Sequence, residues 1–96
     1  MSHYHSKLPT QYDYYGDTTK ILEYISEHNL NDFLNGFYSK VQAEFNVYHI
    51  VISLDDELEI IIYSGATFTK NCLEQIQDKY VPNEIKNIVK VIARRD

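Results

Sequence analysis

Cysteine, glycine, proline and tryptophan are all scarce in this chain of 96 residues, which has one Cys, three Gly, two Pro and no Trp. A single cysteine excludes an internal disulfide and is typical of a reducing compartment, so we expect a cytoplasmic protein. Three widely spaced glycines exclude the glycine-rich loops that bind phosphates and dinucleotides.

Long apolar runs are absent as well. The longest candidate, 58–63, is interrupted by Glu59, whereas a membrane-spanning helix needs about 18 apolar residues. The first residues also lack the basic region and apolar stretch of a secretory signal. We therefore expect neither export nor a membrane-spanning segment.

The composition that remains is that of a small, acidic globular domain. Hydrophobic residues make up 44% and charged residues 24%, which is ordinary for a folded protein, and a chain of this length forms one domain, here 1–96. The net charge of −5 is uneven, because residues 1–69 carry ten acids against three Lys or Arg, and residues 70–96 carry six Lys or Arg against four acids. The acidic part favours basic partners and disfavours nucleic-acid phosphates.

The hydrophobic pattern predicts an α+β fold. We expect residues 1–16 to form an irregular N-terminal arm. The elements that follow are two helices within 17–45, a β-hairpin at about 47–54 and 58–64, a helix at about 69–80, and a C-terminal strand at about 88–93. A C-terminal helix also fits the last segment, but a strand is favoured because a two-stranded sheet alone is marginal. We expect this strand to return beside 47–54.

Local signals refine the two N-terminal helices. Asp17 or Thr18 can cap the first helix, and Asn29 suits the left-handed residue that ends it. Asn31 is the expected cap of the second helix. Gly36 lies inside that helix, which predicts a close contact with a neighbouring helix.

The two hairpin strands are apolar on both faces. One face is rich in isoleucine and is expected to cover the helices. The other is more apolar than a solvated face should be, which predicts that the N-terminal arm, a partner protein or a second copy covers it. This second face comprises Val47, His49, Val51, Ile61 and Tyr63.

The strongest candidate binding site is the acidic tip of the hairpin. Asp55, Asp56 and Glu57 form the turn and Glu59 follows, so carboxylates gather at one end of a stiff element and suit Lys and Arg on a partner. A second acidic and aromatic group, near the N-terminus, would add charge and contact area, since tyrosine is enriched at protein interfaces. The predicted partner-binding residues are Asp55, Asp56, Glu57, Glu59, Tyr63, Asp13, Tyr14, Tyr15 and Asp17.

No set of residues predicts catalysis, a cofactor or a bound metal. His49 and Ser53 share a strand face but lack the sharp nucleophile turn and oxyanion donors of a hydrolase. Cys72 has no histidine near it in sequence and is expected to pack in the core. His3 and His5 supply only two ligands, whereas structural zinc uses four.

The sequence therefore predicts a non-catalytic protein that binds another protein. Small size, acidity and exposed tyrosine suit an inhibitor, an immunity protein or a phage or mobile-element antagonist of host defence. The expected partner is a nuclease, toxin or nucleic-acid-handling enzyme whose basic surface is occluded. The alternatives are a nucleic-acid-linked regulator that uses the basic residues of 86–95, and a homo-oligomeric structural protein or homodimer.

Overall fold

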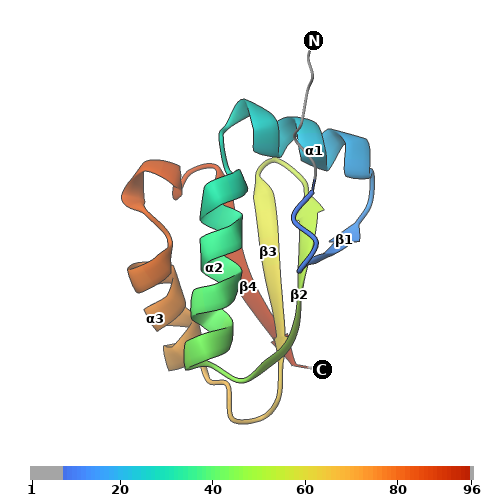
Figure 1. The fold of residues 1–96 in the computed structure, drawn as a ribbon. Coiled ribbons are helices and arrows are strands. Elements are labelled where there is room, and N and C mark those ends of the chain that lie inside the picture. Colours follow the sequence, from blue (N-terminus) through green and yellow to red (C-terminus); the bar gives the residue numbers. More distant parts are fainter. Residues whose placement is uncertain (1–7, 96) are drawn as a thin grey trace.

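The computed structural model describes residues 8–95 and confirms the α+β fold, with three α-helices and a four-stranded sheet (Figure 1). The elements in chain order are β1 (Asp13–Tyr15), α1 (Thr18–Glu27), α2 (Asn31–Glu44), β2 (Val47–Leu54), β3 (Leu58–Ser64), α3 (Lys70–Tyr80), a short 3₁₀ turn (Asn83–Ile85) and β4 (Val89–Arg95). No helix among the described residues is long and apolar enough to cross a membrane.

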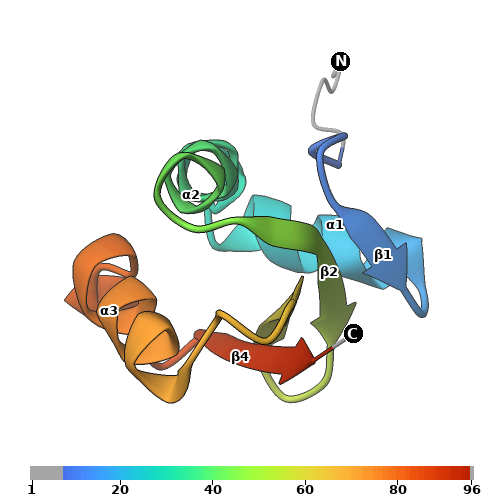
Figure 2. The ribbon, with the colours of Figure 1, turned by 90° about the horizontal axis from the view of Figure 1, so that it is seen from below.

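The strands lie in the order β1-β2-β3-β4. β2 and β3 form the predicted antiparallel hairpin, while β1 runs parallel to β2 and β4 runs parallel to β3. α2 and α3 pack on one face of this sheet, and α1 lies across the end at which β2 and β3 are joined (Figures 1 and 2). The sheet therefore has one helix-covered face and one face without helices in the described part of the chain.

The N-terminal arm was predicted to be irregular over 1–16, and this is wrong for its last part. Residues 13–15 form β1, which extends the sheet beside β2 instead of covering a face. Tyr12 anchors the strand, because its ring is buried and its hydroxyl donates to the Leu34 carbonyl of α2. Residues 1–7 of the predicted arm, with His3 and His5, lie outside the described residues.

The helix boundaries follow the predicted local signals in most places. The Asp17 side chain accepts from the backbone amides of Thr19 and Lys20 at 3.0 and 3.3 Å, and so caps α1. Asn29 has a positive φ of 54°, as predicted for the residue that ends this helix. Asn31, however, is the first residue of α2 and not its cap.

Gly36 does not make the predicted close helix contact. A Cβ atom built on it would have no heavy atom within 4 Å, so the glycine in α2 is not required by packing.

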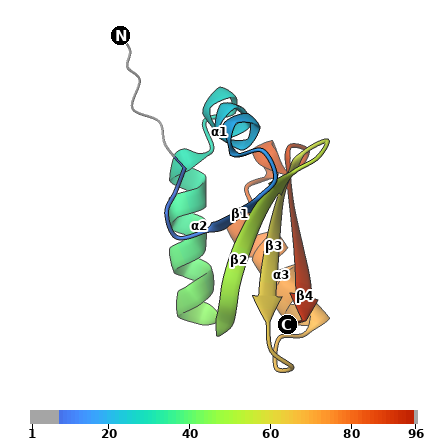
Figure 3. The same cartoon turned by 90° about the vertical axis from the view of Figure 1, so that its right-hand side faces the viewer.

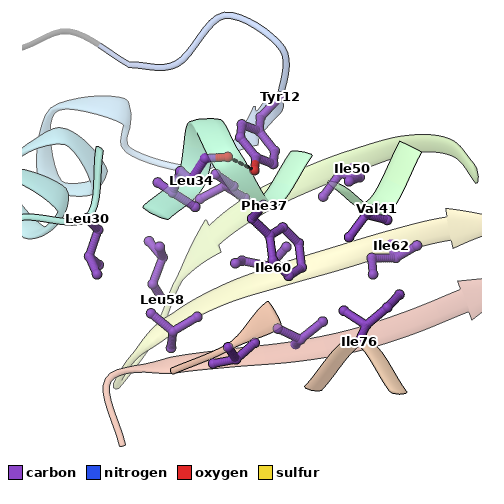
Figure 4. Close-up of a cluster of buried hydrophobic side chains, with 14 of the residues drawn as sticks. Tyr12, Leu30, Leu34, Phe37, Val41, Ile50, Leu58, Ile60, Ile62 and Ile76 are labelled. Atoms are coloured by element: carbon purple, nitrogen blue, oxygen red, sulfur yellow. Dashed lines mark hydrogen bonds between the residues drawn. The ribbon is translucent and has the colours of Figure 1, made fainter. Parts of the chain in front are cut away.

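The core lies between the helices and the inner face of the sheet, which is the face that α2 and α3 cover (Figure 4). Ile50 and Ile52 of β2 pair with Ile62 and Ile60 of β3, and all four are fully buried. Burying such a side chain is worth about 1.5–3 kcal/mol, so this face supplies much of the stability. The helices contribute Ile21, Ile25, Leu34, Phe37, Val41 and Ile76.

A register irregularity at Tyr48 changes the predicted faces of β2. Val47 pairs with Ser64 and the next pair is His49 with Tyr63, so Tyr48 is an extra residue that bulges from the ladder. As a result Val47 is buried in the core, not on the second face, and Tyr48 is 60% exposed. Assigning the faces from the sequence by strict alternation along the strand could not reveal this shift.

β4 is the predicted C-terminal strand, displaced by one or two residues, but its position in the sheet differs. It was expected beside β2, and it pairs instead with β3. The physical reason is the β3-α3-β4 unit, in which one crossover helix returns the chain to the neighbouring parallel position. The other side of β2 is occupied by β1.

Candidate functional site

The face of the sheet without helices is the most extensive candidate site, and we refer to it as the outer face. Its side chains alternate with the core residues along each strand, and the strand register aligns them in three rows across the sheet. The outer face comprises Asp13, Tyr15, His49, Val51, Ser53, Glu59, Ile61, Tyr63, Lys90, Ile92 and Arg94.

The middle row of the outer face is apolar over β2, β3 and β4 and ends at Asp13 of β1, which pairs with Val51. Val51 of β2 pairs with Ile61 of β3, and Ile61 pairs with Ile92 of β4. Ile61 is only 8% exposed although no helix within residues 8–95 covers it, because neighbouring side chains of the same face surround it. Val51 and Ile92 are half-buried.

One flanking row is aromatic and basic. The His49 ring stacks on Tyr63, with ring centroids 4.7 Å apart and planes 10° apart. The carboxylate of Asp13 lies 3.0 Å from His49 Nδ1, which orients the imidazole. Arg94 is the β4 neighbour of Tyr63 in the register. His49, predicted to be a half-exposed residue of the second face, lies there as expected.

The other flanking row is polar. Tyr15 and Ser53 are paired, Ser53 faces Glu59 across β2 and β3, and Glu59 is followed by Lys90. Tyr15 is 73% exposed and lies on the rim. The acidic side chains of the outer face thus lie on β1 and β3, and its basic side chains lie on β4.

The outer face is hollowed by a depression of about 480 Å³. His49 and Ser53 line it, but their geometry does not supply the parts of a hydrolytic site: the hydrogen bond of His49 is to Asp13, and Ser53 lies on a regular strand. The full lining is Tyr15, His49, Val51, Ser53, Glu59, Ile61, Tyr63 and Arg94.

The structure divides the predicted partner-binding residues into three groups. Asp13, Tyr15, Glu59 and Tyr63 lie on the outer face, as the register above shows. The second group is the turn of the hairpin, where Asp55 and Asp56 are exposed, Glu57 is half-buried, and the Asp55 amide donates to the Glu57 carbonyl at 3.1 Å.

The third group consists of Tyr14 and Asp17, whose side chains have structural roles. Tyr14 packs against the core, its hydroxyl donates to the Pro9 carbonyl, and burial raises its pKa to about 12. Asp17 caps α1, as described above. The adjacent Tyr14 and Tyr15 therefore point to opposite faces of the sheet.

Glu59 does not belong to the acidic tip. It lies on β3 opposite Ser53, because the side chains of a strand alternate and position 59 falls on the outer face. The predicted cluster of four carboxylates is thus reduced to Asp55, Asp56 and Glu57.

Lys90, Ile92 and Arg94 complete the outer face and were not predicted to contribute to it. Their alternation with Val89, Val91 and Ala93 was visible in the sequence. The strand position beside β3, which brings them to this face, was not.

No group of three or more His, Cys, Asp or Glu within residues 8–95 could hold a metal ion. Cys72 lies near the start of α3, where the Thr69 hydroxyl is 3.5 Å from its Sγ and lowers the pKa of the thiol. Cys72 is half-buried.

Comparisons with known protein families, with curated proteins and with solved structures find no match to this chain.

Proposed function

We propose that this protein is a non-catalytic protein-binding module whose contact surface is the outer face of the sheet. The observation that carries the proposal is the apolar row of Val51, Ile61 and Ile92, bordered on both sides by polar and aromatic rows. Protein interfaces have this anatomy, with an apolar centre and a polar rim enriched in tyrosine and arginine.

The aromatic residues of the outer face suit such a contact. Tyr15 is largely exposed, and Tyr63 is held in place by stacking on His49. A side chain whose conformation is already restricted loses little entropy on binding. Tyr63 is therefore one expected anchor, and Arg94, its β4 neighbour in the register, is of a residue type that is enriched at binding hot spots.

The acidic groups suit a partner with a basic surface. Asp13 and Glu59 lie on the outer face, and Asp55 and Asp56 are exposed at the end of the same hairpin. With a net charge of −5, this arrangement attracts a cationic partner and orients it on approach. We propose that the partner is a nuclease, a toxin or a nucleic-acid-handling enzyme, and that binding occludes its basic surface.

The test is affinity capture from host extract with the wild-type protein and the double variant Val51→Lys/Ile92→Lys. Two lysines in the apolar row should abolish retention of the partner, because their charge cannot be buried unpaired. The matched control, Ser39→Lys/Gln75→Lys, adds the same charge at exposed helix positions and should retain the partner as the wild type does.

Equal capture by all three proteins would contradict the proposal, provided that circular dichroism shows each of them folded. Light scattering of the wild type alone separates a partner interface from self-association. A dimer that the lysine pair converts to a monomer would show that the outer face binds a second copy instead.

A further inference from the structure

A groove lies along the seam between β4 and α3, at the β4 edge of the sheet, and its lining includes Lys90, Ile92 and Arg94 of the outer face. One hollow of about 400 Å³ borders Val89–Ile92 of β4, and a second of about 240 Å³ borders Ala93–Arg95. β4 is the last strand of the sheet, and α3 lies beside it (Figure 2). We call the two hollows together the β4–α3 groove.

One wall of the β4–α3 groove is a single stripe of the third helix. Lys70 and Leu73 line the second hollow, and Gln77 and Val81 line the first. Their spacing of three to four residues places them on one side of the helix. The wall therefore runs along the whole helix, next to the whole of β4.

The other wall is the edge of β4 that pairs with no strand among residues 8–95. The Leu58 amide donates to the Ile88 carbonyl at 3.0 Å, which assigns the backbone groups of even-numbered residues in β4 to the parallel ladder with β3. The amides and carbonyls of Val89, Val91 and Ala93 then point away from the sheet. In agreement, the outward Val91 carbonyl accepts from the Gln77 side chain of α3 at 2.8 Å.

The groove is strongly basic in an acidic protein. Five of the nine Lys and Arg residues of the chain line it, and Glu57 is the acidic residue among the lining side chains of the two hollows. Lys86 is held at one end, where its Nζ donates to the Gln77 carbonyl at 2.7 Å. The five basic residues are Lys70, Lys86, Lys90, Arg94 and Arg95.

We propose that the β4–α3 groove binds an acidic, extended peptide segment of another protein, which adds to the sheet as a strand beside β4. The outward amides of Val89, Val91 and Ala93 and the carbonyls of Val89 and Ala93 supply donors and acceptors for such a strand, while the Val91 carbonyl already accepts from Gln77. Acidic side chains at two peptide positions four residues apart would face Lys90 and Arg94, with an apolar residue between them beside Ile92.

The same basic side chains disfavour two other molecules that could bind at the edge of β4, a second copy of this chain and a nucleic acid. A second copy paired antiparallel about Ile92 would set Lys90 against Arg94, and like charges directly opposite are destabilising. A nucleic acid would meet the basic side chains, but its phosphates only accept hydrogen bonds and cannot satisfy the outward Val89 and Ala93 carbonyls. An acidic peptide can pair its carboxylates with the basic side chains and its backbone with the outward amides and carbonyls of β4.

The test uses a capped nine-residue peptide in which two glutamates, four residues apart, flank a valine. Its binding to the full chain is followed by the amide shifts of β4 and α3 in NMR spectra. N-methylation of the peptide amides that face β4 should weaken binding by about tenfold or more, whereas N-methylation of the alternate amides should have little effect. Equal effects in the two positions would overturn strand addition.

The charge requirement is tested on the protein. Lys90→Glu/Arg94→Glu should abolish binding of the peptide, and the matched control Lys20→Glu/Lys40→Glu, on α1 and α2, should bind it as the wild type does. Equal loss of peptide binding in both variants would show a general charge effect and would contradict binding in the β4–α3 groove. A single-stranded oligonucleotide that shifts the same β4 amides while the peptide shifts none would assign the groove to nucleic acid instead.

Discussion

The two faces of the sheet are built from similar apolar residues but differ in what surrounds these residues. On the inner face, Ile60 and Ile62 lie under the helices and are fully buried. On the outer face, Ile61 lies between them in sequence and is 8% exposed, although no helix of the described chain lies above it. In Figure 3, α2 lies to the left of the strands, α3 lies behind them, and α1 lies at one end of the sheet.

The difference between the faces lies in what surrounds the apolar residues. Inner-face isoleucines are enclosed by the side chains of α2 and α3, so their burial contributes to folding. Within the described part of the chain, outer-face residues are enclosed by the charged and aromatic rows beside them, and these rows remain in contact with water. The inner face therefore determines stability, and we propose that the outer face determines binding.

The largest expected effect comes from neighbouring isoleucines on opposite faces. Ile60→Ala leaves a cavity in the core and should lower the free energy of unfolding by about 3–4 kcal/mol. Ile61→Ala, the matched change on the outer face, should cost about 1–2 kcal/mol, because side chains and water can fill the space. Urea unfolding followed by circular dichroism measures both, and equal costs would break the comparison.

A smaller effect is expected from reversing the charge of the hairpin tip. The triple variant Asp55→Lys, Asp56→Lys and Glu57→Lys should weaken binding of the captured partner by about tenfold at low salt, equal to about 1.4 kcal/mol. The loss should shrink at ~0.5 M salt, where exposed charges are screened. Unchanged affinity at low salt, measured by titration calorimetry, would remove the tip from the binding surface.

Tyr12 and Tyr14, which pack in or against the core, predict that the folded protein loses stability at alkaline pH. Burial raises the pKa of Tyr12 above its ordinary value and that of Tyr14 to about 12. Because the neutral form is favoured in the folded state, this stability is complete below about pH 10 and is lost as the pH rises toward 12.

Tyr12→Phe checks the assignment. It removes the hydrogen bond to the Leu34 carbonyl and should cost about 1 kcal/mol near pH 8. The variant should then lose less stability than the wild type between about pH 8 and pH 11. Urea unfolding at both pH values gives the comparison, and identical losses would exclude Tyr12 as a source of the alkaline sensitivity.

The smallest expected effect is a gain in stability. Gly36→Ala places a methyl group where no heavy atom lies within 4 Å and replaces the residue with the greatest backbone freedom inside a helix. The free energy of unfolding should rise by about 0.5–1 kcal/mol, measured by thermal or urea unfolding. A loss would show that the packing of α2 against the inner face requires the glycine.

The elements with strong periodicity were predictable from sequence. The hairpin, α3 and the cap and end of α1 agree with the predictions, because apolar spacing and the preferences of Asp17 and Asn29 act locally. β1 was not predictable, since three residues carry too short a pattern. The bulge at Tyr48 was not predictable for a related reason, since a bulge adds a residue without changing the composition.

The predicted second face was correct in His49, Val51, Ile61 and Tyr63, all of which lie in the hairpin. The C-terminal strand was predicted, but its place beside β3 was not. The position of Lys90, Ile92 and Arg94 on the sheet depends on which strand β4 joins. Beside β3 they extend the outer face next to Ile61 and Tyr63, whereas beside β2 they would lie on the other side of the hairpin. That choice is made by the crossover through α3, and no local signal in 88–95 encodes it.

By itself, the amino-acid sequence determined the type of each long element and the two-sided apolar character of the hairpin, because both follow from the spacing of side chains a few residues apart. Only the tertiary structure decided that β1 and β4 flank the hairpin. It thereby set Asp13 beside His49 and collected five basic side chains along one edge of an acidic protein. These neighbours are distant in sequence, and their pairing depends on the packing of the whole core.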